Sequence, residues 1–179
     1  DAFKSLLDNA RSILITTHKS PDGDAIGSAA AFSRFVSAYG KKNHILLPDA
    51  PAENLMSFLD GVAYSFFDDF DLLEDHYDLM ICLDYNHPHR VGDKMKSLVS
   101  ELNVPKIMIE HHPNPTEFCD LTISRPEVCS TAQLLFEVLQ ECELHTYLTK
   151  EACEALYLGI MTDTGSFRFP SVTAKTHEI

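Results

Sequence analysis

The sequence predicts an α/β domain with a mainly parallel sheet and helices on both faces. Short runs rich in β-branched residues alternate along the chain with longer runs that carry apolar residues at helical spacing. This alternation indicates parallel strands joined by crossover helices, and two of the short runs are apolar almost throughout, as doubly buried strands are. Because no repeat and no linker rich in Pro, Gly and Ser divides the 179 residues, we expect one domain.

The first half of the chain contains three predicted strands and one predicted helix. Residues 12–17 (SILITT) form a short β-branched run that predicts the first strand. Residues 25–39, rich in Ala and Phe, predict a helix that Gly40 closes as a C-terminal signal. The runs at 44–47 and 63–67 predict the second and third strands.

The second half of the chain contains two predicted strands and two predicted helices. Residues 78–83 (DLMICL) and 106–109 (KIMI) are the near-continuous apolar runs of buried strands. Residues 130–142 predict a helix, since a capping-box pattern opens at Ser130 and apolar residues follow at helical spacing. Residues 150–161 predict a further, more buried helix.

Composition and charge exclude several classes of protein. Hydrophobic residues make up 45% and charged residues 23%, which is typical of a soluble globular domain. No apolar run approaches the roughly 18 to 20 residues that span a bilayer, so we expect no membrane association. The net charge of −13 argues against a module that grips long nucleic acid. Phosphate chemistry stays open, because bound cations would invert the local field.

The cysteines indicate a cytoplasmic protein. Their number is odd and none has CxxC spacing, so we expect reduced, mostly buried side chains rather than disulfides. They are Cys82, Cys119, Cys129, Cys142 and Cys153.

Acidic and His residues follow four of the strand-like or buried apolar runs. The four segments are His18-Lys-Ser-Pro-Asp22-Gly-Asp24, Asp84, Glu110-His111-His112, and Asp163 after the helix ending LGIM. Each segment alone reads as a turn, a cap or a surface pair. In a parallel α/β fold, however, ligands bind outside the carboxyl ends of the strands. We therefore expect these side chains to converge at one edge of the sheet.

The chemistry of this set favours divalent cations. Carboxylates and imidazoles without thiolates suit Mn²⁺ or a similar harder cation better than a structural Zn²⁺. Two cations about 3.5 to 4 Å apart need a bridging ligand and several terminal ligands, which this set can supply. Gly23 and Gly27 would let the backbone pass close to the site, and the start of the 25–39 helix would aim N–H groups at an anion.

Four motifs together resemble those of a known family. HKSPDGDAIGS, LDYN, EHHPNP and GIMTDTGSFRF, in this order and spanning residues 18–169, are similar to motifs I to IV of the DHH phosphoesterases. Within that family they look closest to the RecJ-like subgroup of oligoribonucleases and 3′-phosphoadenosine-5′-phosphate (pAp) phosphatases. The resemblance implies that residues 1–179 form a DHH-type catalytic domain of a two-metal phosphoesterase. The family's C-terminal substrate-binding (DHHA1-type) domain has no counterpart in this chain.

The resemblance also implies roles for the motif residues. One metal would be held by His18, Asp22 and Asp84, and the other by Asp24, Asp84, His111 and Asp163. Asp84 would be the catalytic bridge between the two cations. A water bridging both cations, its pKa lowered by them, would be the nucleophile.

Further residues would contact the substrate or support the ligands. His112 would face the scissile phosphate, stabilising its charge or protonating the leaving group. Arg90 and Arg168 would contact phosphate, with ordinary surface salt bridges as the alternative for each. The third motif carries Glu110 where the family has Asp, and this acid would orient His111 without touching the metal.

The most specific expectation is an enzyme that hydrolyses small nucleotides, such as pAp or short oligoribonucleotides, with two Mn²⁺ ions. The alternatives are a single-strand-specific exonuclease, a pyrophosphatase-type hydrolase, or a nucleotide-binding domain whose catalysis has lapsed. We expect no long nucleic acid as partner. A homodimer stays open.

Overall fold

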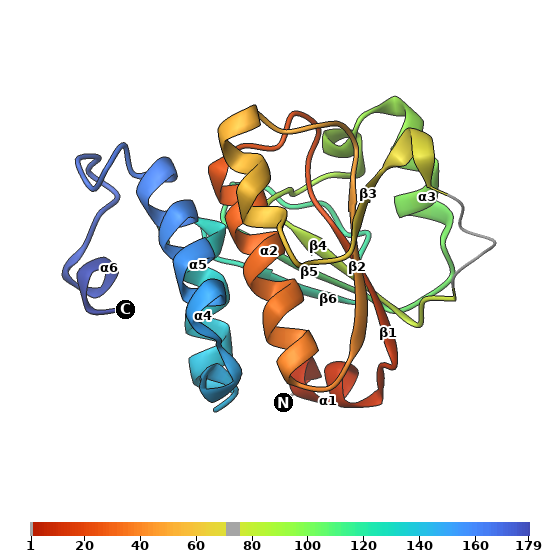
Figure 1. The fold of residues 1–179 in the computed structure, drawn as a ribbon, viewed down its shortest axis with the longest axis horizontal. Coiled ribbons are helices and arrows are strands. Elements are labelled where there is room, and N and C mark those ends of the chain that lie inside the picture. The colour runs from red at the N-terminus through yellow and green to blue at the C-terminus, as the bar shows by residue number, and fades with distance from the viewer. Residues whose placement is uncertain (1, 71–75) are drawn as a thin grey trace.

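The computed structural model describes residues 2–70 and 76–179 and contains a six-stranded parallel sheet (Figure 1). The strand order is β3-β2-β1-β4-β5-β6, and every neighbouring pair is parallel. From β1 the chain adds β2 and β3 on one side of the sheet. It then crosses to the other side of β1 and adds β4, β5 and β6 there. The strand order reverses between β1 and β4, and in such folds ligands bind outside the carboxyl ends of the strands at this point. The predicted α/β class is confirmed.

The strands lie close to the predicted runs. They are β1 Ser12–Thr16, β2 Lys42–Leu47, β3 Tyr64–Phe66, β4 Leu79–Leu83, β5 Lys106–Glu110 and β6 Leu121–Ser124. Strand β6 was not predicted. It is short and only partly buried at the sheet edge, so its sequence lacks the continuous apolar run that marks β4 and β5.

The helices differ more from prediction. They are α1 Ala2–Asn9, α2 Gly23–Ala38, α3 Asp93–Glu101, α4 Thr131–Glu141, α5 Lys150–Asp163 and α6 Ala174–Glu178. Short 3-10 helices lie at η1 Glu53–Leu59, η2 Phe67–Asp69, η3 Pro88–Val91 and η4 His145–Tyr147. Neither α1 nor α3 was predicted. Helix α5 runs two residues beyond the predicted end and so includes Asp163 itself.

Helix α2 starts earlier than the sequence pattern indicated, because its cap belongs to the acidic motif. The Asp22 carboxylate accepts hydrogen bonds from the backbone N–H groups of Asp24 at 3.0 Å and Ala25 at 3.1 Å. Asp22 is therefore the N-cap, and the helix begins at Gly23 rather than at Ala25. The cap residue and the first-turn Asp24 are held in a fixed relation by the helix itself.

The cap of α4 is only half of the predicted capping box. The Ser130 hydroxyl accepts a hydrogen bond from the Gln133 N–H at 3.0 Å, as predicted. The Gln133 side chain does not return to the N-cap backbone; its amide donates to Glu137 at 2.8 Å. The hydroxyl alone therefore caps the start of α4.

Alternate residues of each strand pack into two cores. Ile13 and Ile81 pack with α2, α4 and α5, whereas Leu14 and Met80 point to the other face, where Met95 of α3 covers them. Helices therefore cover both faces, as predicted, and the inner strands are buried on both sides. Of the helices in the described ranges, none combines the length and apolar character needed to cross a membrane.

Helices α2 and α5 approach each other closely because glycines face the contact. A Cβ at Gly27 would lie 2.5 Å from the carbonyl oxygen of Ala155, and a Cβ at Gly23 would collide with the Thr162 side chain. A Cβ at Gly159 would lie 2.8 Å from Oδ1 of Asp24. The close approach brings the amino end of α2 beside the carboxyl end of α5 (Figure 1).

Candidate metal centre

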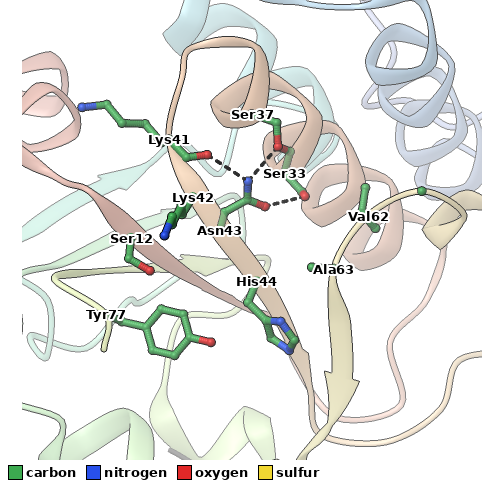
Figure 2. A pocket seen from close by; sticks show the side chains of 11 residues that line it. Ser12, Ser33, Ser37, Lys41, Lys42, Asn43, His44, Val62, Ala63 and Tyr77 are labelled. Atoms are coloured by element: carbon green, nitrogen blue, oxygen red, sulfur yellow. Dashed lines mark hydrogen bonds between the residues drawn. The ribbon is translucent and has the colours of Figure 1, made fainter. Parts of the chain in front are cut away.

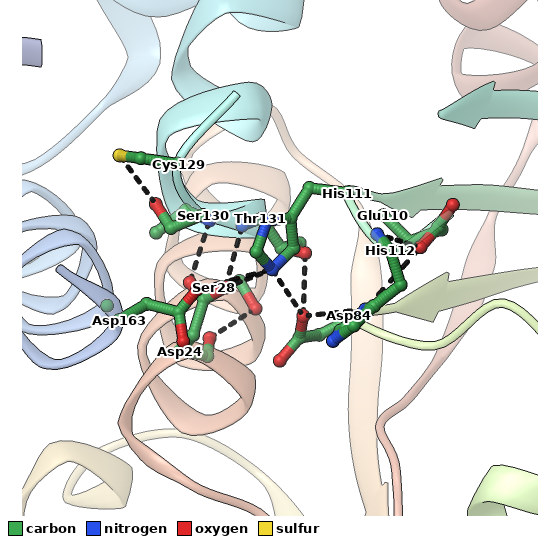
Figure 3. A network of polar contacts seen from close by, with 12 residues as sticks. Asp24, Ser28, Asp84, Glu110, His111, His112, Cys129, Ser130, Thr131 and Asp163 are labelled. Carbon is green, nitrogen blue, oxygen red and sulfur yellow. Dashed lines mark hydrogen bonds and ion pairs between the residues drawn. The ribbon is translucent and has the colours of Figure 1, made fainter. Parts of the chain in front are cut away.

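The six predicted ligands meet at the carboxyl end of the sheet, and Figure 3 shows four of them side by side. They come from the loop after β1, the start of α2, the ends of β4 and β5, and the end of α5: His18, Asp22, Asp24, Asp84, His111 and Asp163. Their ligand atoms form overlapping groups, and within each group all ligand atoms lie within 4.8 Å of one another. The expected convergence at one edge is therefore observed.

The first triad consists of His18, Asp22 and Asp84. Nε2 of His18 lies 3.4 Å from Oδ2 of Asp84 and 3.8 Å from Oδ1 of Asp22. Nδ1 of His18 lies 2.8 Å from the carbonyl oxygen of Lys19, which can only accept, so Nδ1 carries the proton. The lone pair of Nε2 can then face the two carboxylates, as in a metal-ligating His.

Protons and cations compete at this triad. Burial lowers the pKa of His18, but attraction to the carboxylates of Asp22 and Asp84 outweighs it and raises this pKa to about 10. A cation that takes Nε2 must displace this proton. Binding at the first triad is therefore expected to strengthen as the pH rises.

The second triad consists of Asp24, His111 and Asp163. Nε2 of His111 lies 3.3 Å from Oδ2 of Asp163 and 3.7 Å from Oδ2 of Asp24. Nδ1 of His111 lies 3.1 Å from the carbonyl oxygen of Val128, so this ring too presents Nε2 to the carboxylates.

Asp84 connects the two triads through its two different oxygens. Oδ2 faces His18 at 3.4 Å, and Oδ1 lies 3.7 Å from Nε2 of His111. The residue has a left-handed backbone conformation with φ +64, and its N–H donates to the carbonyl oxygen of Ile109 at 3.1 Å. This unfavourable conformation for a residue with a side chain is held by the neighbouring strand and aims the carboxylate between the triads.

The start of α4 fixes two of the carboxylates. The backbone N–H groups of Thr131 and Ala132 donate to Oδ2 and Oδ1 of Asp24 at 2.7 and 2.9 Å, and the Thr131 hydroxyl donates to Oδ1 of Asp84 at 2.8 Å. Figure 3 shows Thr131 between the two acids. The role of Thr131 was not predicted from the sequence. Its only signal was the cap at Ser130, which predicted a helix start but not what the helix would face.

The electrostatics of the cluster fit divalent cations. Burial raises the pKa of Asp24 well above its ordinary value, and the charges of Asp84 and Asp163 raise it further. Burial likewise raises the pKa of Asp163, with Asp84 adding to the effect. These carboxylates repel one another, and cations between them would remove the repulsion. The oxygen and imidazole donors, with no thiolate among the triads, suit Mn²⁺-like cations.

His112 lies beside the triads, and its buried Nδ1 contacts carboxylates only at ion-pair distances. Its Nδ1 lies 3.8 Å from Oδ1 of Asp84 and 3.5 Å from Oε2 of Glu110, and it forms no hydrogen bond within the described residues. Attraction to Glu110 raises the pKa of His112, although burial opposes it. The His112 ring therefore holds a proton more readily than a free imidazole does.

The expectation that Glu110 orients His111 is wrong. The Glu110 carboxylate is fully buried and accepts hydrogen bonds from the His112 backbone N–H at 2.5 Å and from the Ser124 hydroxyl. His111 is instead oriented by the Val128 carbonyl group. The acid of the third motif therefore positions the second His and ties the end of β5 to β6.

The two predicted phosphate-binding arginines lie outside the cluster. Arg90 is an exposed residue of η3, and its charge is felt at His112, whose pKa it lowers slightly against the larger effect of Glu110. Arg168 is exposed, and its Nε donates to the Gly165 carbonyl oxygen at 2.7 Å. Within the described residues, neither guanidinium hydrogen-bonds a ligand of either triad.

A separate polar pocket opens at the other end of the sheet (Figure 2). It has a volume of about 400 Å³ and is lined by the first residues of β1 and β2, Ser12 and Lys42, together with His44 and Tyr77. Nε2 of His44 lies 2.7 Å from the Ser65 hydroxyl oxygen. None of the six predicted ligands lines this pocket, so the chemistry lies at the opposite edge.

Comparison with known sequences places most of the chain in one family. The sequence model described as "DHH family, N-terminal domain" matches residues 12–160. A curated Bacillus subtilis protein named bifunctional oligoribonuclease and PAP phosphatase NrnA is 30% identical over 92% of this chain and 50% of its own length. The Thermus thermophilus protein of the same name is 33% identical over 90% of this chain and 46% of its own length. The chain thus spans about half the length of these relatives.

Solved structures give the same picture of the fold. An exopolyphosphatase-related protein from Bacteroides fragilis superposes with a TM-score of 0.90 and 33% identity, covering 99% of this chain and 53% of its own. The exonuclease RecJ bound to manganese superposes with a TM-score of 0.51 and 15% identity, covering 93% of this chain and 42% of its own. The second likeness concerns the fold alone.

Proposed function

The chain belongs to the DHH family, and on that premise we propose that residues 1–179 form a catalytic domain that hydrolyses phosphoesters of small nucleotides with two divalent cations. The names of the relatives support the reaction and the substrate class. Location in the cytoplasm and dimerisation stay predictions.

One observation carries the proposal: Asp84 presents one oxygen to each triad. A two-cation site needs a shared ligand of this kind. We assign the first triad to one cation and the second triad to the other, with Asp84 contributing to both. A nucleotide-binding domain without catalysis is less well supported, because each triad keeps all three of its donor residues. In both triads a backbone carbonyl group at Nδ1 orients the imidazole so that Nε2 faces the carboxylates.

The residues around the triads have distinct tasks in the proposed reaction. When bound, the cations would supply an activated water and neutralise charge on the phosphate. His112, whose pKa is raised by Glu110, would bind the phosphate oxygens and carry a proton for the leaving oxygen. Arg90 and Arg168 are exposed and would contact phosphate groups beyond the scissile one.

The substrates we propose are pAp and short oligoribonucleotides. The net charge of −13 opposes binding of long polyanions, because little counterion release is gained on an acidic surface. The same negative charge also disfavours long single-stranded nucleic acid, the substrate of the exonuclease alternative, and polyphosphate.

A turnover panel tests the proposal. The purified chain would be assayed with Mn²⁺ or Mg²⁺ against pAp, a dinucleotide, pyrophosphate and long single-stranded DNA. We expect pAp and the dinucleotide to be turned over faster with Mn²⁺ than with Mg²⁺, since the imidazole donors suit Mn²⁺ better. Metal analysis after Mn²⁺ loading should give two ions per chain. Less than one ion, or turnover unaffected by chelation, would overturn the two-cation assignment.

A further inference from the structure

A groove leads away from the first triad along one side of the site. It has a volume of about 480 Å³, within the roughly 300 to 1,000 Å³ of small-molecule sites, and its lining includes Asp22 and Thr162, the neighbour of Asp163. The Asp22 side chain is 59% exposed and belongs both to the first triad and to the lining of the groove. A group attached to a phosphate at the metals could enter the groove directly.

Apart from Asp22, the walls of the groove are neutral and more apolar than polar. One wall is the loop before α2, with Ser20 and Pro21, and the other is the segment 50–55 that leads into η1. The lining contains two prolines, three small apolar side chains or glycine, and Leu55; Asp22 is its one charged residue among the described ones. Without Lys or Arg, this lining offers nothing to a second phosphate group.

The groove is held in shape before any ligand arrives. The Ser20 backbone N–H donates to Oδ1 of Asp49 at 2.6 Å, and this bond ties one wall to the residue preceding the other wall. Ser20 adopts φ +53, which turns the loop toward that partner. A preformed groove binds a ligand without an ordering cost.

One polar side chain in the groove has no partner. The amide of Asn54 is exposed on the outer wall and makes no hydrogen bond within the described residues, whereas the Thr162 hydroxyl donates to the carbonyl oxygen of Leu158 at 2.9 Å. An amide has both donors and acceptors, which is what the edge of a nucleobase requires.

We propose that this groove binds the nucleoside of the substrate, with the base against Pro51 and its edge at the Asn54 amide. The inference rests on the proposed function and deepens it. A flat neutral group fits an apolar groove with one free amide, whereas the phosphate chain of a polyphosphate does not. The groove therefore selects nucleotides over inorganic polyphosphates.

Kinetics with a matched pair of substrates test the groove. The pair is pAp and its base-free counterpart, ribose 3,5-bisphosphate, assayed with Mn²⁺. Ala52 is exposed on the groove wall, so Ala52→Trp would fill the space the base occupies. We expect the preference for pAp, as a ratio of kcat/KM values, to fall about tenfold in Ala52→Trp and severalfold in Asn54→Ala. Ala2→Trp, at an exposed alanine of α1, is the control and should keep the wild-type ratio.

Binding of adenosine gives a readout that needs neither metal nor turnover. In the metal-free protein, millimolar adenosine should shift the backbone amide NMR signals of Gly23, Asn54 and Thr162. These shifts should vanish in Ala52→Trp and persist in Ala2→Trp. Shifts that gather elsewhere, no shifts at all, or an unchanged pAp preference in a folded Ala52→Trp would overturn the groove assignment. If no ester is turned over, the proposed function fails, and the adenosine titration still decides the groove.

Discussion

The Thr131 hydroxyl donates a hydrogen bond of 2.8 Å to Oδ1 of Asp84, the oxygen that lies 3.7 Å from Nε2 of His111. A helix start thus orients the acid that faces both triads. Asp84 comes from β4 and Thr131 from the first turn of α4, so this relation exists only once the sheet and helix are packed together.

Removing this hydroxyl should weaken cation binding without unfolding the protein. In Thr131→Val the shape is kept, but Asp84 loses the donor that fixes its rotamer. We expect Mn²⁺ affinity or activity to fall about 10- to 100-fold, as for other residues that orient ligands. Thr131→Ser keeps the hydroxyl and is the matched control. Calorimetric Mn²⁺ titrations of the three proteins measure the effect, and equal affinities would argue against it.

Removing the charge of Asp84 should lower activity and metal binding more than removing the hydroxyl that orients its carboxylate. Asp84→Asn is the preferred variant, because Asn tolerates the left-handed backbone at φ +64 better than Ala. We expect a loss of activity beyond the about 100-fold of an orienting residue, together with loss of bound metal. The metal-free variant should be as stable as the wild type or more so, since Asp24 is relieved of a repelling charge. Urea denaturation and metal analysis check both parts; near wild-type turnover would remove the bridging role.

Replacing Glu110 should shift the titration of His112. Interaction with Glu110 raises the pKa of His112 above its ordinary value of 6.5, so Glu110→Gln should lower that pKa in the metal-free protein. NMR titration of the His112 ring measures it. The attraction between protonated His112 and Glu110 stabilises the folded protein. This stabilisation is fully present below about pH 6.5 and is lost as the pH rises through the raised pKa of His112 in the folded state.

The free energy of unfolding provides a second check on this pair. The stability difference between wild type and Glu110→Gln should be more in favour of the wild type below pH 6.5 than at pH values above the raised pKa of His112. A difference independent of pH would mean that Glu110 acts only through its hydrogen bonds from the Ser124 hydroxyl and the His112 backbone N–H.

A methyl group at Gly159 should disturb the second triad. Its Cβ would lie 2.5 Å from the Cβ of Ala132 and 2.8 Å from Oδ1 of Asp24. We expect Gly159→Ala to lose about 1 to 3 kcal/mol of stability and to weaken binding of one of the two cations. Gly27→Ala is the matched control, because it strains the same helix contact against the Ala155 backbone and not against a carboxylate. If Gly159→Ala binds two Mn²⁺ ions as tightly as Gly27→Ala, the close approach is not what places Asp24.

The sequence by itself predicted five of the six strands and the acidic and His side chains that meet at the carboxyl end of the sheet. The buried strands β4 and β5 are nearly continuous apolar runs, a pattern that can be recognised without knowing the tertiary structure. The acids and histidines that follow them were visible for the same reason, since the carboxyl ends of parallel strands share one edge. Strand β6 and helices α1 and α3 carry weaker patterns, and their formation depends on the edge or surface that they cover.

Only the tertiary structure decided how the ligands are held. The sequence placed Glu110 next to His111, but the pleat at the end of β5 turns its carboxylate toward Ser124 and the His112 backbone. Thr131 carried no sign of its role, because its partner Asp84 is 47 residues away in the chain. Hydrogen bonds between distant segments depend on side-chain direction and helix packing, which no local sequence pattern predicts. Strand burial and the residue types that follow each strand, in contrast, can be predicted from short stretches of neighbouring residues.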